Sequence, residues 1–175
     1  MNRKLTLKYI TFETPLGRIV VAESPDGIAL VNFLSRDCPT EDAAISSVLR
    51  NYPDATLSPG GDSLLLGKTK AYILAYLTNR APVPKVPLDL RKGTGFDRNV
   101  WTAIETIAFG ESQSYSQIAA QVHSAGASRA VGGACGRNPV PILIPCHRVI
   151  GSGGKLGGYS GGLHIKRALL DLEKS

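Results

Sequence analysis

The chain has 175 residues, of which 43% are apolar and 19% are charged. This composition is too hydrophobic for a disordered segment and fits one or two compact domains. At this length about two-thirds of the unfolded surface leaves water on folding, so we expect folding without disulfides or a structural metal. Three cysteines, an odd number, argue against a secreted disulfide framework. No window reaches ~18 consecutive apolar residues, and the N-terminus lacks a signal-peptide pattern. We therefore expect a cytoplasmic protein, or a nuclear one in a eukaryote, without membrane contact.

The formal net charge of +6 is unevenly distributed along the chain. Residues 1–90 contain ten Lys or Arg and nine Asp or Glu, whereas residues 91–175 contain ten and five. No acidic residue occurs from Ser112 to Leu170, a stretch that contains six Lys or Arg. Such a stretch would attract a polyanion such as nucleic acid. A solvated basic surface without a ligand is an equally good interpretation of the charge alone.

The first half of the chain has the pattern of a small α/β domain. Three β-branched or aromatic runs, separated by turn sequences with Pro and Gly, predict a three-stranded antiparallel meander. Two helical patterns follow the third run. The predicted strands are Leu5–Glu13, Arg18–Glu23 and Ile28–Leu34, and the predicted helices are Thr40–Asn51 and Lys68–Thr78. This half has no histidine and one cysteine, Cys38, for which we expect only a packing role.

A proline-rich segment is expected to join two domains. It contains Pro82, Pro84 and Pro87. Proline lacks a backbone N–H and keeps its neighbours extended, which prevents a helix here. We therefore expect a first domain over residues 1–80, a linker over residues 81–93 and a second domain over residues 94–175.

The second half is predicted to contain a helix-turn-helix. An amphipathic helix over Phe96–Ala108 comes first. Ser114 and Gln117 have the spacing of a capping box, which begins a short helix. A turn that contains Gly126 then leads to another short helix, and two short helices joined in this way are typical of the motif.

The second of these short helices contains Gly132 and Gly133. Each costs about 1 kcal/mol relative to Ala in a helix interior, so small side chains must be favoured for another reason. A backbone that approaches another surface closely would favour them, with Arg129 as the long side chain projecting from that face. Close packing against the core of the protein itself is the alternative.

Reactive residues are concentrated in the apolar segment Asn138–Ile150, which contains three prolines. The prolines predict a stiff, largely buried, extended segment. A buried cysteine such as Cys146 is most often unreactive. Here, however, His147 could accept the thiol proton, and Arg148 would add positive potential that favours the thiolate.

A catalytic base needs a group that orients it, and the last predicted helix, Leu163–Glu173, offers a carboxylate. Glu173 lies at the edge of the apolar stripe of this helix, at its C-terminus, where the helix dipole disfavours an anion. A partner is therefore expected. His147 would complete a Cys-His-Glu relay in which the carboxylate fixes the imidazole tautomer. A solvated terminal glutamate is the alternative.

Three motifs of the second half resemble those of the O6-alkylguanine-DNA alkyltransferases, also called methylated-DNA--protein-cysteine methyltransferases. They are Pro145-Cys146-His147-Arg148 preceded by Asn138-Pro139, Arg129-Ala130-Val131-Gly132-Gly133, and Gly158-Tyr159-Ser160-Gly161-Gly162-Leu163. The similarity is strong over residues 96–173 and weak at the turn Thr14–Gly17. It implies an α+β fold with a ribonuclease-H-like N-terminal α/β domain and a C-terminal winged helix-turn-helix domain.

The resemblance also implies an activity. The chain would be a single-turnover methylated-DNA-[protein]-cysteine S-methyltransferase that repairs O6-alkylguanine, with O4-alkylthymine as a second candidate substrate. Cys146 would accept the alkyl group irreversibly, and His147 would act as the base through a water molecule. Glu173 would be the third member of the relay, and Asn138 would link the recognition helix to the active-site segment.

Further residues are assigned to substrate and DNA by the same resemblance. Tyr115 would help to rotate the nucleotide out of the duplex, and Arg129 would fill the gap in the base stack. The guanine pocket would be lined by Pro141, Tyr159 and Ser160, with the Val149 carbonyl accepting from the exocyclic amine. The residues expected in the minor groove of double-stranded DNA are Ser128, Arg129, Ala130, Gly132, Gly133 and Arg137.

Elementary chemistry supports this interpretation independently. The O6 atom of guanine is inaccessible to a protein nucleophile inside the stack, so the nucleotide must be extruded. Insertion of a side chain through the minor groove can offset the unstacking. Transfer of carbon to a thiolate forms a thioether, which no neighbouring group hydrolyses, so the protein should react once. A DNA-binding module with a structural Cys146, or a cysteine hydrolase, remains as an alternative.

We expect neither a cofactor nor a metal. The first half has one cysteine and no histidine, and Cys135, Cys146 and His147 lack metal-ligand spacing. Gly154-Lys155 is followed by Leu156 rather than Ser or Thr, which argues against a phosphate-binding P-loop. A monomer without an obligate protein partner is expected.

Overall fold

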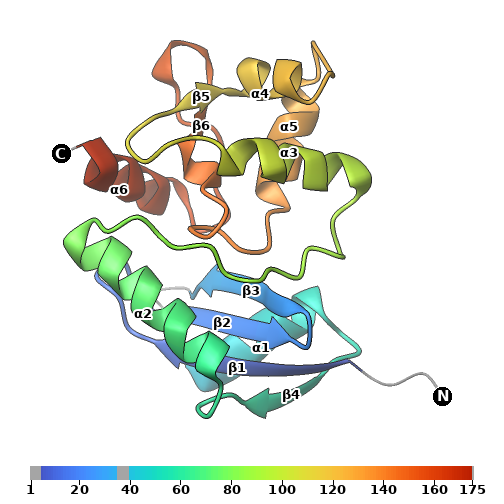
Figure 1. Cartoon of the computed structure of the whole chain (residues 1–175), viewed down its shortest axis with the longest axis vertical. Coiled ribbons are helices and arrows are strands. Elements are labelled where there is room, and N and C mark those ends of the chain that lie inside the picture. Colours follow the sequence, from blue (N-terminus) through green and yellow to red (C-terminus); the bar gives the residue numbers. More distant parts are fainter. Residues whose placement is uncertain (1–4, 35–39, 175) are drawn as a thin grey trace. The chain divides into compact units, whose positions relative to one another are not determined.

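The computed structural model describes residues 5–34 and 40–174 (Figure 1), so Cys38 lies outside the described residues. By its internal packing the chain divides into two compact units, Met1–Asp89 and Leu90–Ser175. The division falls within the proline-rich segment 81–93. Among the described residues, no helix is both long enough and apolar enough to cross a bilayer.

The first unit is built on a four-stranded sheet with the order β3-β2-β1-β4. The predicted antiparallel meander is present as β1 (Thr6–Phe12), β2 (Ile19–Ser24) and β3 (Gly27–Phe33). The meander is extended by β4 (Thr56–Pro59), which pairs in parallel with β1. The sequence did not predict this fourth strand, because a four-residue segment that ends in proline carries almost no alternating pattern.

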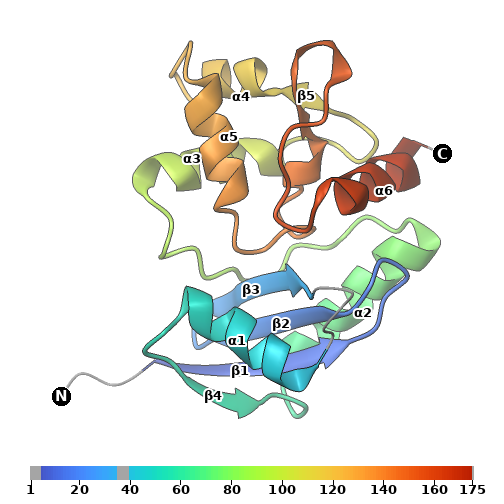
Figure 2. The ribbon, with the colours of Figure 1, turned by 180° about the vertical axis from the view of Figure 1, so that it is seen from behind.

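Helices cover both faces of this sheet. Figures 1 and 2, which view the protein from opposite sides, show α1 (Glu41–Asn51) on one face and α2 (Leu64–Asn79) on the other. Ala44 and Val48 of α1 belong to a buried apolar cluster with residues of all three meander strands. Helix α2 begins four residues before the predicted start, because the side chain of Ser63 caps the N–H of Leu66.

The second unit contains four α-helices and a small parallel pairing of β5 (Gln113–Ser114) with β6 (Val149–Ile150). Its helices are α3 (Gly95–Glu105), α4 (Tyr115–Gln121), α5 (Ser128–Gly136) and α6 (Leu163–Lys174). The capping box predicted at Ser114 begins α4, and a second capping box at Thr94 begins α3. The turn between α4 and α5 contains Gly126 with a φ of +86°, a conformation that favours glycine.

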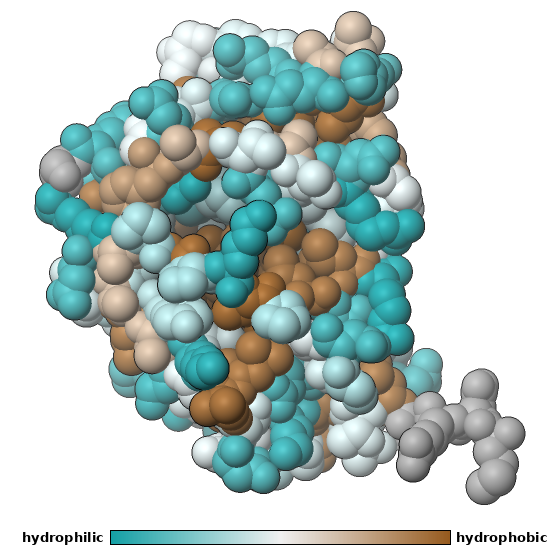
Figure 3. Space-filling view, viewed as in Figure 1, coloured by the Kyte–Doolittle hydropathy of each residue, from teal (hydrophilic) through white to brown (hydrophobic). Residues whose placement is uncertain are grey.

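The core of this unit connects α3 to α5. Trp101 of α3 is 1% exposed, and its Nε1 donates a 2.9 Å hydrogen bond to the carbonyl oxygen of Ala134 in α5. Val131 and Ala134 are themselves fully buried. Figure 3 shows that hydrophilic and near-neutral residues predominate over the end of the unit where β5 and α4 lie.

The segment Asn138–Ile150 is buried as predicted, but it is not an extended piece. Ile144 N donates to Val140 O at 3.0 Å, and Ile142 has a φ of +76°. A 3-10 turn, η1, follows over Cys146–Arg148, directly after Pro145. The extended prediction was wrong because the fixed φ of proline, about −65°, suits tight turns as well as strands.

Candidate active site

Cys146 begins the 3-10 turn η1 and is 3% exposed. The buried side chain of Asn138 holds this thiol, since its Nδ2 donates to Cys146 Sγ at 3.1 Å and to Ile144 O at 2.9 Å. Asn138 Oδ1 in turn accepts from Val140 N at 3.0 Å. The Asn138 side chain, two residues after the end of α5, therefore connects that end of the helix to the segment that carries the cysteine.

The environment of Cys146 keeps its sulfur protonated at neutral pH. Burial raises the thiol pKa to about 11, although the Asn138 hydrogen bond and the positive charge of Lys166 act in the opposite direction. A base must therefore remove the proton before the sulfur can act as a nucleophile. The expected contribution of Arg148 to the thiolate was wrong, because its guanidinium is bonded to Glu173 and the nearby cation is Lys166.

His147 and Glu173 form the pair that the sequence suggested. The imidazole is fully buried, and its Nε2 lies 2.9 Å from Glu173 Oε1. Burial lowers the pKa of His147 despite the carboxylate beside it, so the ring is neutral near pH 7. In the neutral ring Nε2–H donates to the carboxylate, which leaves the lone pair on Nδ1. His147 is thus in the protonation state that a base requires.

Glu173 is 6% exposed, so the alternative of a solvated terminal glutamate is wrong. Arg148 donates to it through Nε and Nη2, both at 2.9 Å, and Gly110 N donates at 3.0 Å. The third guanidinium nitrogen of Arg148, Nη1, donates to Ile107 O at 2.7 Å. These donors compensate the carboxylate at the C-terminal end of α6 and hold the His147 partner in place.

Lys166 is a site residue that the sequence analysis missed. Its side chain is fully buried, and its Nζ donates to Val149 O at 2.7 Å and lies 5.8 Å from the centre of the Tyr115 ring. Burial lowers its pKa, while the two cysteines Cys146 and Cys135 raise it. One signal was present in the sequence: Lys166 precedes Leu169 by three residues and Leu170 by four, which places it on the apolar face of α6.

Tyr115 begins α4 and packs against two glycines. A Cβ atom at Gly157 would lie 2.1 Å from Tyr115 Oη, and one at Gly132 would lie 3.8 Å from the ring. The ring is half-buried, and burial raises the pKa of its hydroxyl to about 12. Gly157 is therefore required for the observed position of Tyr115, and Gly132 of α5 has a neighbour within the protein itself.

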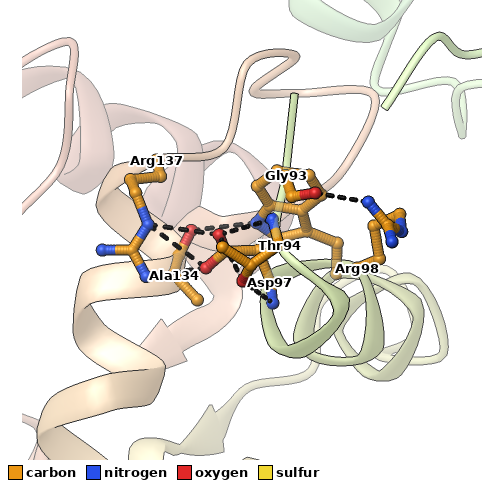
Figure 4. A network of polar contacts seen from close by, with 7 residues as sticks. Gly93, Thr94, Asp97, Arg98, Ala134 and Arg137 are labelled. Carbon is orange, nitrogen blue, oxygen red and sulfur yellow. Dashed lines mark hydrogen bonds and ion pairs between the residues drawn. The ribbon is translucent and has the colours of Figure 1, made fainter. Parts of the chain in front are cut away.

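Only part of the acid-free stretch forms a basic surface. Lys166 is buried, Arg148 is bonded to Glu173, and Arg137 forms an ion pair with Asp97 (Figure 4). Besides the ion-paired Arg137, the exposed cations of the stretch are Arg129, Lys155 and Arg167. Whether the stretch faces a nucleic acid or only solvent stays open, and the question applies to its exposed side chains and not to Lys166, which is buried.

The remaining predicted site residues differ in exposure. Arg129 and Ala130 lie on the exposed side of α5, and Ser128, Gly132 and Gly133 are partly exposed. Pro141 and Val149 are buried, Tyr159 is half-buried and Ser160 is exposed. In the described part of the chain, no three His, Cys, Asp or Glu side chains cluster as metal ligands. The expectation that the chain binds no zinc stays a prediction, because Cys38 lies outside that part.

Fold and site together define a mixed α+β protein that carries a buried cysteine beside a histidine–glutamate pair. Residues 95–175 match the family model described as 6-O-methylguanine DNA methyltransferase, DNA binding domain. The methylated-DNA--protein-cysteine methyltransferase of Mycobacterium tuberculosis is 43% identical over 169 residues, which cover 97% of this chain and 93% of the relative. The constitutive methylated-DNA--protein-cysteine methyltransferase of Bacillus subtilis is 38% identical, with coverages of 95% and 94%.

Solved structures are similar as well. The crystal structure of Mycobacterium tuberculosis OGT in complex with DNA has a TM-score of 0.76 and 37% identity, and the match covers 97% of this chain and 92% of that one. The chain belongs to the methylated-DNA--protein-cysteine methyltransferase family, whose members are enzymes of DNA repair.

Proposed function

We propose that this protein repairs O6-alkylguanine in double-stranded DNA by moving the alkyl group, once per chain, onto Sγ of Cys146. The observation that carries the proposal is the arrangement around that sulfur. Asn138 donates to the thiol, and the adjacent His147 is neutral and bonded to the buried carboxylate of Glu173. A nucleophile, a base and a group that orients the base are thus present together.

The reaction balances with the residues of the chain and one water molecule. The thiol proton of Cys146 passes through a water molecule to His147, and Glu173 stabilises the imidazolium. The sulfur then attacks the alkyl carbon, so that an S–C bond forms and the C–O6 bond breaks. The electron pair stays on the guanine, which takes up the proton and is released unmodified. The thioether is not hydrolysed, and each chain reacts once.

The substrate must leave the base stack to meet a buried sulfur. Arg129 is exposed on α5 and would fill the gap from the minor groove, while Tyr115 would help to rotate the nucleotide. Small residues on the same helix would let the backbone approach the groove: Ser128, Ala130, Gly132 and Gly133. In this proposal α4 and α5 are the two helices of a winged helix-turn-helix domain over residues 94–175, which acts as a monomer.

The flipped guanine would lie against Pro141, Tyr159 and Ser160. The Val149 carbonyl already accepts a hydrogen bond from Lys166. A carbonyl oxygen has two lone pairs, so it can also accept from the exocyclic amine of the guanine. The exocyclic amine of the guanine and Lys166 would therefore donate to the same carbonyl oxygen. Residues 1–80 are proposed to form a ribonuclease-H-like domain, joined to the second domain by the linker 81–93.

A duplex with a single O6-methylguanine, labelled in the methyl group, tests the proposal. The label should become fixed to the protein at no more than one per chain, and peptide mass spectrometry should place it on Cys146. Cys146→Ala should abolish the transfer, whereas Cys135→Ala, at the other buried cysteine of the second unit, should retain it. Release of labelled methanol would identify a hydrolase, and binding without transfer would identify a DNA-binding module. Either result would overturn the proposal.

A further inference from the structure

A second polar network lies at the N-terminus of α3 (Figure 4). Arg137 Nη2 donates to Asp97 Oδ1 at 2.7 Å, and Arg137 Nε lies 3.2 and 3.3 Å from the two carboxylate oxygens. The Asp97 side chain is 2% exposed, whereas that of Arg137 is 57% exposed. The carboxylate is therefore desolvated and depends on its partners, while the guanidinium reaches it from the surface.

Asp97 also fixes the beginning of α3. Its Oδ2 accepts from Thr94 N at 3.0 Å and from Thr94 Oγ1 at 2.9 Å, and Thr94 Oγ1 accepts from Asp97 N at 3.1 Å. These contacts form the capping box of the helix. One carboxylate thus holds both the N-terminus of α3 and the guanidinium of Arg137.

Arg137 is the C-cap residue of α5 and directly precedes Asn138. One turn earlier, the carbonyl of Ala134 accepts from Trp101 Nε1. The C-terminal end of α5 is therefore attached to α3 at two points, through Ala134 and through Arg137. The next residue along the chain, Asn138, is the one whose amide donates to Cys146 Sγ.

Helix α5 itself accommodates this attachment. A Cβ atom at Gly133 would lie 3.1 Å from Arg137 Nη1, closer than ordinary side-chain contacts. Glycine at this position leaves room for the guanidinium to reach Asp97. The position of Arg137 therefore explains the glycine at position 133 without any approach of α5 to DNA.

We propose that Asp97 and Arg137 are a positioning pair: their ion pair ties the end of α5 to the start of α3, and thereby places the Asn138 amide against the Cys146 thiol. Arg137 then acts through Asn138 rather than as a ligand of a DNA phosphate. This inference rests on the proposed function for its meaning in repair, but the thiol environment it describes can be measured without DNA.

The physical consequence follows from the Asn138 hydrogen bond. Removal of either partner breaks an ion pair with one buried member, so that Arg137 no longer holds the end of α5 to α3. The end of α5 then keeps only its attachment through Ala134, so the residues after Ala134 can shift, and Asn138 shifts with them. A donor that points less directly at sulfur stabilises the thiolate less, and the thiol becomes harder to ionise. The Cys146 sulfur should react more slowly with any electrophile.

The test compares Arg137→Gln, Asp97→Asn and the double variant with Arg98→Gln as the matched control. Arg98 is an exposed arginine of the same network. It donates to Gly93 O, and no hydrogen bond drawn in Figure 4 joins it to α5. The rate at which iodoacetamide modifies Cys146 is measured against pH by peptide mass spectrometry. The rate with free O6-benzylguanine and the salt dependence of duplex binding are measured in parallel.

We expect Arg137→Gln and Asp97→Asn each to slow both reactions of Cys146 by roughly tenfold, since small displacements of positioned groups can cost up to ~100-fold. The pH profile of the iodoacetamide reaction should move to higher pH in both variants, a shift that loss of stability alone would not cause. The double variant should be no slower than the slower single variant, because the two residues act as one unit. Arg98→Gln should match the wild type.

The competing role of Arg137 predicts a different pattern. If Arg137 binds a phosphate, Arg137→Gln weakens duplex binding and lowers the salt slope by about one unit, Cys146 keeps its pH profile, and Asp97→Asn has no effect on the thiol. That pattern would overturn the positioning pair. If Asp97→Asn does not fold, the exposed Arg137→Gln decides alone. A wild-type Cys146 that reacts with iodoacetamide but not with O6-benzylguanine would instead count against the proposed function.

Discussion

The buried ammonium of Lys166 donates a 2.7 Å hydrogen bond to the carbonyl oxygen of Val149. This contact places a positive charge near Cys146, where it favours the thiolate against the effect of burial. Val149 lies in β6, which pairs with β5 immediately before Tyr115. Lys166 thus links α6 to the small sheet and to the electrostatics of the nucleophile.

Lys166→Met should make Cys146 less reactive. Methionine keeps an apolar side chain of similar length but removes the charge, so the thiol pKa should rise further above its wild-type value of about 11. The measurement is the rate of iodoacetamide modification at Cys146 between neutral and alkaline pH. Lys174→Met, at the exposed end of the same helix, is the control. An unchanged profile for Lys166→Met would show that its charge does not reach the sulfur.

Gly157→Ala should displace Tyr115, because the added Cβ would lie 2.1 Å from Tyr115 Oη. We expect a loss of about 1–3 kcal/mol in the free energy of unfolding, the usual cost of overpacking, together with slower repair of duplex. Gly158→Ala is the matched control, since nothing lies within 4 Å of its added Cβ. Urea denaturation measures the first effect. Equal stabilities for the two variants would contradict the predicted clash.

Glu173→Gln should impair both stability and reaction. The substitution removes the buried charge that His147 and Arg148 share, and breaking such a pair costs about 3–5 kcal/mol. The imidazolium formed during proton transfer also loses its stabilising partner. Thermal or urea unfolding and the single-turnover rate with O6-benzylguanine are the measurements. Glu105→Gln, at the exposed end of α3, should leave both close to wild type.

Arg129→Ala should slow the extrusion of the nucleotide without slowing the transfer of the alkyl group. If this exposed side chain fills the gap in the base stack, its loss leaves the unstacking energy of a few kcal/mol without compensation. The rate of duplex repair should then fall by roughly tenfold or more, while the reaction with free O6-benzylguanine should change little. Arg167→Ala, another exposed arginine of the unit, controls for loss of charge. Equal losses on both substrates would reject the role in extrusion.

The Asp97–Arg137 pair should contribute stability with a defined pH dependence. The hydrogen bond from Arg137 lowers the pKa of Asp97 below its ordinary value of 3.8, against the opposing effect of burial. The unfolded state therefore binds the proton more readily than the folded state. The contribution is present above pH 3.8 and is lost as the pH falls through the folded-state value below it. The difference in unfolding free energy between wild type and Asp97→Asn should shrink over that acid range. A constant difference would mean that the charge contributes nothing.

Local patterns in the sequence were sufficient for much of the architecture. The meander, the capping box at Ser114 and the two helices that follow it depend on turn residues, caps and apolar periodicity, which neighbouring residues determine together. The nucleophile and its base could be named for a similar reason. Cys146 and His147 are adjacent in the chain, within an apolar and proline-rich segment.

Long-range contacts were decided only by the tertiary structure. Strand β4 exists because β1 offers it an edge, and its four residues carry no pattern that would predict it. The partner of Arg137, forty positions away at Asp97, could not be inferred from an arginine in an acid-free stretch. Arg148 was expected to supply positive charge beside the sulfur, but it is bonded to Glu173. The buried Lys166 supplies that charge instead. Charge and residue type are local properties, whereas desolvation and pairing depend on which distant segments the fold brings together.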